Sequence, residues 1–201
     1  MPRHSLLREA GMMIRAFVAL ILPDEVCDQL AGLQAELPAG RIVPRENLHV
    51  TLAFIGRQPE PLLAELDLTL AAIAAPALSL RIEGVGGFGP GPRPRSIHAV
   101  LRPDPALDGL RRKVENAARG LGIALPARRF VPHVTLARPR AGRVDPPRLE
   151  RALAAAMDFR LGPFTVHAFA LYQSLPGREG PVYEVLASYP LGRDGAAPIP
   201  C

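Results

Sequence analysis

The chain has 201 residues, of which 48% are hydrophobic, and its formal net charge is +5. This length and composition fit one domain with a sizeable core, and they argue against low-complexity disorder. No apolar run approaches the length of a membrane span, so we expect no membrane association. A mild positive charge suits an anionic ligand without identifying one.

The cysteines and the two ends of the chain indicate the cellular compartment and the bounds of the domain. Cys27 and Cys201 are too few for a disulfide framework or a zinc site, so we expect a cytoplasmic protein. The first residues, "MPRHSLLREAGMM", lack the long apolar core and the cleavage site of a signal peptide. We expect residues 1–13 to be a disordered N-terminal extension, residues 14–191 a single bilobal domain, and residues 192–201 a flexible tail.

The first half of the domain predicts alternating strands and helices. An apolar run at 14–21 has strand length, and Pro23 and Asp24 then open a helix. The apolar residues of this helix recur at helical spacing as one stripe: Val26, Leu30, Leu33 and Leu37. The elements predicted after it are strands at 41–43 and 48–55, a helix at 60–75, and strands at 77–85 and 96–101. The Gly/Pro-rich segment between the last two strands is typical of a hairpin loop.

The second half repeats this plan. The elements predicted here are a helix at 105–120, a motif strand within 128–138, a helix at 147–157, and strands at 164–174 and 182–189. The spacing also repeats, because His98 lies 49 residues after His49, and Tyr183 lies 50 residues after His133. We therefore predict an α+β fold of two pseudo-symmetric lobes, each an antiparallel sheet with two helices, around a central cleft.

The clearest sign of duplication is the pentapeptide "HVTLA", which occurs at residues 49–53 and again at 133–137. Side chains alternate between the two faces of a strand, so each copy places a histidine and a threonine together on the face opposite the apolar residues. His49 and Thr51 come from the first copy, and His133 and Thr135 from the second. His98 and His167 have no threonine two residues on, so we interpret them as ordinary strand histidines.

Two such pairs facing each other across a cleft would suit phosphate chemistry. Histidine titrates near neutral pH, so one imidazole can act as a base while the other acts as an acid. Threonine hydroxyls can donate to the non-bridging oxygens of a phosphate and stabilise charge as it develops there. The chain lacks H-E-x-x-H and any cysteine cluster, so we expect neither a metal nor another cofactor.

The chain resembles the two-histidine (2H) phosphoesterases, and most of all the bacterial and archaeal RNA 2′,3′-cyclic phosphodiesterases, originally called 2′-5′ RNA ligases. The resemblance is carried by "IRAFVALILP", "NLHVTLAFIG", "FVPHVTLAR" and "LYQSLPGREGPVYEVL". It implies the 2H fold, and it implies hydrolysis of 2′,3′-cyclic phosphate ends of RNA or nucleotides to 2′-phosphomonoesters. It also implies that His49 is the proton donor, that His133 is the proton acceptor, and that Thr51 and Thr135 bind the phosphate.

Three further residues are weaker candidates for substrate binding. Arg138 follows the second motif, but strict alternation places it on the core face unless a bulge or the strand end redirects it. Arg129 precedes the motif in a stretch of six arginines without an acid, which could attract RNA phosphates: Arg119, Arg128, Arg129, Arg138, Arg140 and Arg143. Phe54 could stack on a base, although alternation favours packing in the core.

Other functions remain open from the sequence. The same cleft could run in reverse as a 2′-5′ RNA ligase, joining a partner that bears a 2′-phosphate to a 5′-hydroxyl. It could bind RNA ends without catalysis, or it could hydrolyse another cyclic phosphate such as an ADP-ribose derivative. The internal pseudo-dimer removes the need for a second subunit, so we expect a monomer with no obligate protein partner.

Overall fold

The computed structural model describes residues 12–38, 40–89, 94–127, 129–139, 144–178 and 180–192. Most of the predicted N-terminal extension and nearly all of the predicted tail lie outside these residues, as do Arg128, Arg140 and Arg143. Thirteen elements follow one another in the described chain. The strands are β1 (Met13–Ile21), β2 (His49–Pro59), β3 (Leu78–Phe88), β4 (Ser96–Leu101), β5 (His133–Ala137), β6 (Arg160–Val166), β7 (Ala168–Leu175) and β8 (Val182–Pro190). The helices are α1 (Asp24–Glu36), η1 (Arg45–Asn47), α2 (Glu60–Ala71), α3 (Pro105–Gly120) and α4 (Pro146–Ala156).

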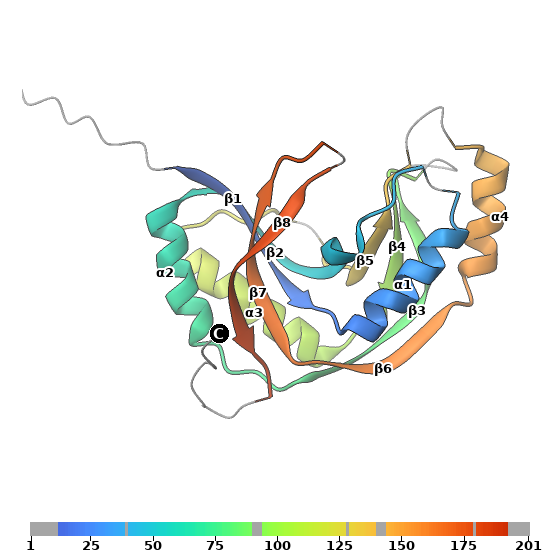
Figure 1. Cartoon of the computed structure of the whole chain (residues 1–201). Helices are drawn as coiled ribbons and strands as arrows, with labels where there is room; N and C mark the ends of the chain where they lie inside the picture. Colours follow the sequence, from blue (N-terminus) through green and yellow to red (C-terminus); the bar gives the residue numbers. More distant parts are fainter. Residues whose placement is uncertain are drawn as a thin grey trace, which may run out of the picture.

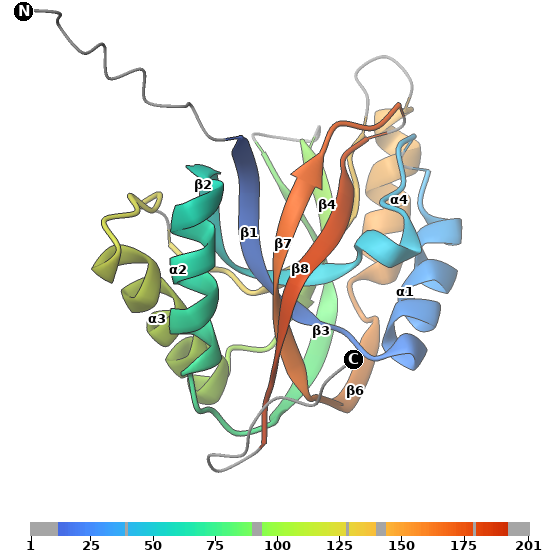
Figure 2. The same ribbon diagram turned by 60° about the vertical axis from the view of Figure 1, so that its left-hand side comes forward.

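One antiparallel sheet runs through the molecule in the order β6-β3-β4-β5-β2-β1-β7-β8. Its two four-stranded halves meet between β5 and β2, where a single residue pair, Val50 with Val134, joins them. Helices α2 and α3 cover one half, and α1 and α4 cover the other (Figures 1 and 2). The predicted arrangement of two antiparallel lobes with two helices each is therefore confirmed.

The lobes do not correspond to the two halves of the sequence. Strand β4 pairs with β5 of the second motif and β3 pairs with β4, whereas β7 and β8 extend the sheet formed by β1 and β2 of the first motif. Helix α1 packs near β5, and α3 packs near β2. Each lobe is therefore completed by elements from the other half of the chain, and this interlocking holds both motif strands at the centre.

The helices form where apolar spacing and capping coincide. Helix α3 begins after Asp104, whose carboxylate accepts hydrogen bonds of 2.9 Å from the backbone nitrogens of Ala106 and Leu107. Pro105 fits the first turn, since no intrahelical hydrogen bond is needed from its nitrogen. The buried stripe of this helix is Leu107, Leu110, Val114 and Ala118. Together with the inward faces of the strands, these stripes form one continuous core.

Some predicted boundaries are wrong. The segment 41–43 contributes only an isolated bridge between Ile42 and Ala137 instead of a full strand. The strand predicted at 164–174 is divided into β6 and β7, which lie on opposite sides of the strand order, because the chain crosses between the lobes at His167. Among the described helices, none combines the length and apolarity needed to cross a membrane.

Candidate active site

The two motif strands place four polar side chains on one face of the sheet. Val50 and Val134 form the pair that joins β2 and β5, and both are fully buried. In this antiparallel register the residues on either side of each valine point to the opposite face, so His49 lies across from Thr135 and Thr51 lies across from His133. All four line one pocket of about 710 Å³.

Each catalytic candidate is held by the same local bond. His49 Nδ1 lies 2.7 Å from the carbonyl oxygen of Asn47, and His133 Nδ1 lies 2.7 Å from that of Val131. A carbonyl only accepts, so Nδ1 carries the proton in both rings and Nε2 presents its lone pair when the ring is neutral. The pseudo-symmetry therefore extends to the tautomer of the two imidazoles.

The environment of Nε2 differs between the two rings. His49 Nε2 lies 3.0 Å from Thr51 Oγ1, so the threonine hydroxyl donates to the neutral ring. The described residues provide no corresponding hydrogen bond to His133 Nε2. The two imidazoles therefore differ in the partner of Nε2 although Nδ1 is held alike.

Burial disfavours the protonated, charged form of both imidazoles. It lowers the pKa of His49 to about 4, an effect that the Asn47 carbonyl opposes and that the nearby His133 and Arg138 reinforce. Burial also lowers the pKa of His133, again opposed by a carbonyl, that of Val131, and reinforced by Arg138. Both rings are therefore neutral at pH 7 in the free protein, and either can accept a proton.

Aromatic rings pack beside each histidine. The His49 ring centre lies 4.9 Å from that of Phe17 and 5.3 Å from that of Tyr183, which meets it edge-on. The His133 ring centre lies 4.9 Å from Phe88 and 5.2 Å from His98, both also edge-on.

The repeated spacing in the sequence explains these contacts. Tyr183 follows His133 in the chain but packs on His49, while His98 follows His49 but packs on His133, as the exchange of strands requires. Our interpretation of His98 as an ordinary strand histidine missed this contact. Its side chain is only 4% exposed, and Nδ1 has no hydrogen-bond partner among the described residues.

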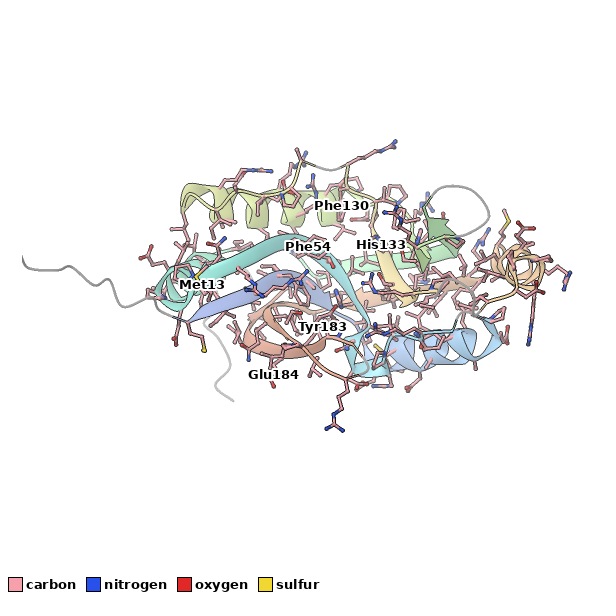
Figure 3. All side chains as sticks on the ribbon, turned by 90° about the horizontal axis from the view of Figure 1, so that it is seen from above. Met13, Phe54, Phe130, His133, Tyr183 and Glu184 are labelled. Atoms are coloured by element: carbon pink, nitrogen blue, oxygen red, sulfur yellow. The ribbon has the colours of Figure 1, made fainter. Side chains whose placement is uncertain are left out.

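Phe54 lies in the pocket, so the prediction that it packs in the core is wrong. Its side chain is 60% exposed and lines the pocket, and it lies between α3 and β8 in the view from above (Figure 3). The reason is a bulge in β2: Val18 pairs with Ala53 and the next residue, Ala19, pairs with Thr51, so Leu52 is an extra residue. The bulge reverses the alternation that follows it.

Arg138 reaches the pocket through the same device. In β5 the partners of Ile97 and His98 are Ala137 and Thr135, which makes Leu136 an extra residue. Both copies of the pentapeptide thus bulge at their leucine, and the residue after each copy, Phe54 or Arg138, turns toward the pocket. The core-facing placement that strict alternation gave for Arg138 is therefore wrong, and a bulge redirects it.

Of the remaining residues considered from the sequence, Arg129 lies on the pocket lining and His167 does not. Arg129 is exposed and lines the pocket from the loop before β5. His167 lies outside the pocket lining and is exposed. Sequence reasoning missed Arg41, Arg178, Phe17 and Phe88. Phe17 and Arg178 lie within segments that carry the family resemblance, but neither is part of the repeated pentapeptide that singled out the other candidates. Within the described ranges, no three His, Cys, Asp or Glu side chains are grouped so as to hold a metal ion.

Comparison with known proteins places this site in a family. Residues 22–178 match the 2′-5′ RNA ligase superfamily. An RNA 2′,3′-cyclic phosphodiesterase of Aeropyrum pernix is 34% identical over 73% of this chain and 83% of its own length. One of Geobacillus stearothermophilus is also 34% identical, over 87% of this chain, although the chain spans only 56% of that relative's length.

Solved structures agree with this relationship. Escherichia coli LigT complexed with 3′-AMP has a TM-score of 0.71 and 28% identity, covering 90% of this chain and all of that one. The TT0787 protein of Thermus thermophilus gives a TM-score of 0.71, 28% identity and the same coverage. This chain therefore belongs to the 2′-5′ RNA ligase superfamily, among the proteins related to RNA 2′,3′-cyclic phosphodiesterases.

Proposed function

We propose that this protein hydrolyses the 2′,3′-cyclic phosphate at the end of an RNA or a nucleotide and leaves a 2′-phosphomonoester. The carrying observation is the pocket in which two imidazoles, each with its Nδ1 proton bonded to a carbonyl, accompany two threonine hydroxyls. Relatives at 34% identity are named RNA 2′,3′-cyclic phosphodiesterases, which supports the same substrate class.

The reaction needs one proton taken up and one released. Water attacks phosphorus in line with the departing 3′-oxygen, so a new P–O bond forms while the bond from phosphorus to the 3′-oxygen breaks. His133 Nε2 accepts a proton from the water, and His49 gives a proton from Nε2 to the leaving 3′-oxygen. Thr51 and Thr135 donate hydrogen bonds to the phosphoryl oxygens as negative charge grows on them.

The assignment of the two roles is supported by the environments of the rings. His133 Nε2 has no partner among the described residues and is open to a water molecule. His49 Nε2 lies beside Thr51 Oγ1, a hydroxyl that can turn to accept from the protonated ring. Burial opposes that protonation in the free protein. The negative charge of the bound cyclic phosphate would offset it by raising the pKa of His49.

The weaker candidates fit the rest of the substrate. Phe54 offers an exposed aromatic face on which the terminal base can stack. Arg138 and Arg129 line the pocket and can attract its phosphates. One chain supplies both halves of the pocket, so we propose that it acts as a monomer without an obligate partner. We place its action in the cytoplasm, which its low cysteine content supports.

The test is turnover of adenosine 2′,3′-cyclic phosphate with identification of the product by chromatography. We expect 2′-AMP, and we expect His49→Ala and His133→Ala each to lower turnover by roughly 10²- to 10⁴-fold. His167→Ala is the matched control, because that histidine is exposed and lies outside the pocket lining.

Three outcomes would count against parts of the proposal. A 3′-phosphate product would exclude the 3′-oxygen as leaving group. Near-normal turnover in either active-site variant would reject that histidine's role. Binding without turnover in the wild type would favour the RNA-end binder.

A further inference from the structure

The arginines that line the pocket differ in their partners. Arg111 is paired with Glu115 on α3. The other four have no acidic partner among the described residues: Arg41, Arg129, Arg138 and Arg178. The acidic side chains on the described lining are Glu46 and Glu115, and Glu115 is already engaged by Arg111 and Arg119. The described lining therefore holds more arginines than acidic side chains.

Arg41 is fixed beside the end of β5. Its carbonyl oxygen accepts a hydrogen bond of 2.8 Å from the backbone nitrogen of Arg138, and the next residue, Ile42, bridges to Ala137. The amide of the buried Gln34 donates to the carbonyls of Val43 and Leu136, at 2.9 and 2.7 Å, which ties this segment to the bulge in β5. The backbone that carries Arg41 is thus part of the rigid wall.

The guanidinium of Arg41 lies against the turn between β7 and β8. It packs on Gly180, where a Cβ atom would overlap its terminal nitrogen, and Gly180 has a positive φ of 141°. Asn47 Nδ2 donates to the carbonyl of Pro181 at 2.9 Å, so the turn is tied to the same wall. Arg178 lies on this turn and lines the pocket as well.

Arg41 and Arg178 line the pocket from segments outside the two motif strands, which carry the histidines and threonines. The backbone of Arg41 lies beside Arg138, which follows the end of β5 three residues after Thr135, at most about 10 Å of extended chain. In an RNA end, the first anion beyond the 2′,3′-cyclic phosphate is the 5′-phosphate of the same nucleoside. Guanidinium groups match the geometry of such a phosphate.

We propose that Arg41 and Arg178 form a second phosphate subsite, which takes the 5′-phosphate of the terminal nucleotide. The inference rests on the proposed function and extends it from a cyclic phosphate alone to an end that continues in the 5′ direction. With Phe54 available for the base, the subsite orients the ribose so that its 5′ side faces the turn between β7 and β8.

The test compares two substrates that differ by one phosphate: adenosine 2′,3′-cyclic phosphate and its 5′-phosphorylated form. We expect the wild type to favour the 5′-phosphorylated substrate by about tenfold in kcat/KM at low salt. The preference should fall as salt is raised, because the subsite is open to solvent and its charges are screened. Equal kcat/KM for both substrates in the wild type would overturn the proposal.

Two variants distinguish the effect of the Arg41 charge on the substrate preference from the effect of its position. Arg41→Ala should bring the preference close to unity, and Gly180→Ala should lower it by displacing the guanidinium without removing its charge. Arg57→Ala is the matched control, since Arg57 is exposed on β2 and lies outside the pocket lining. Circular dichroism checks that each variant is folded.

Failure of the subsite proposal can be distinguished from failure of the proposed hydrolase activity. An equal loss for both substrates in folded Arg41→Ala would overturn the subsite, because Arg41 would then serve the reacting phosphate or the fold. If the wild type turns over neither substrate, the hydrolase activity itself is refuted, and the subsite with it.

Discussion

Replacing Thr51 with valine tests the site at its point of asymmetry. Valine keeps the branched shape that suits a strand, so the backbone of β2 should be retained while the hydroxyl is lost. That hydroxyl lies 3.0 Å from His49 Nε2 and faces the pocket. The substitution therefore removes a bond to the proposed proton donor together with a donor to the phosphoryl oxygens.

The expected loss follows from the strength of such bonds. A hydrogen bond to a charged group contributes about 1.5–3 kcal/mol, and each 1.36 kcal/mol is about tenfold in rate. We therefore expect Thr51→Val to lower kcat for adenosine 2′,3′-cyclic phosphate by roughly 10- to 150-fold. Thr135→Val should lower kcat less, because in the described structure Thr135 makes no hydrogen bond to a catalytic ring.

The assay is product formation followed by chromatography at saturating and at low substrate, which separates kcat from KM. Thr69→Val is the control, because that hydroxyl bonds to the carbonyl of Glu65 on α2, away from the pocket. A folded Thr51→Val protein with kcat within about threefold of wild type would refute this account of the hydroxyl.

Three further predictions address pH and substrate contacts. The proposed reaction needs one neutral and one protonated imidazole, and the pKa values of His49 and His133 both lie below 6.5. The form with one protonated ring therefore becomes scarcer as pH rises, and kcat/KM should fall about tenfold per pH unit above neutrality. A midpoint of this fall above pH 6.5 would contradict the prediction. Burial, with His133 nearby, lowers the pKa of His98 to about 4, so the unfolded chain binds its proton first as pH falls below 6.5. The wild type should therefore lose about 2 kcal/mol more stability than His98→Phe between pH 7 and pH 5 in urea unfolding, and equal losses would reject the explanation. Phe54→Ala should raise KM by about tenfold with kcat little changed if the ring stacks on the base, whereas Phe54→Tyr should restore KM.

The fold was predictable where the pattern is local. The spacing of its apolar residues gave the bounds of α3, 105–120, because helix formation depends on residues three and four apart. The repeated pentapeptide likewise placed both His–Thr pairs on one face, since strand alternation needs only neighbouring residues. Both features arise within a few residues of chain.

The rest depends on contacts between distant residues. No local pattern states that β4 pairs with β5 or that β7 pairs with β1, so the exchange of strands between lobes was not predictable. The packing of Tyr183 on His49 follows from that exchange. Arg41 was missed for the same reason, because its place depends on the bridge at Ile42 and on the turn at Gly180.

Bulges limited the prediction of the pocket lining. Alternation assigned Phe54 and Arg138 to the core, and an extra residue shortly before each of them, Leu52 or Leu136, reversed both assignments. A leucine looks the same in a regular strand and in a bulge, so the letters alone carry no signal for it.

The paired bulges have a consequence for how a duplicated catalyst acquires a direction. Two identical five-residue segments form a site without polarity, in which a ligand could bind in either of two orientations. The sixth position removes this equivalence, because one segment continues into Phe54 and the other into Arg138. Divergence just outside the repeated letters thus gives the two ends of the pocket different chemistry, which would favour one orientation of a bound ligand.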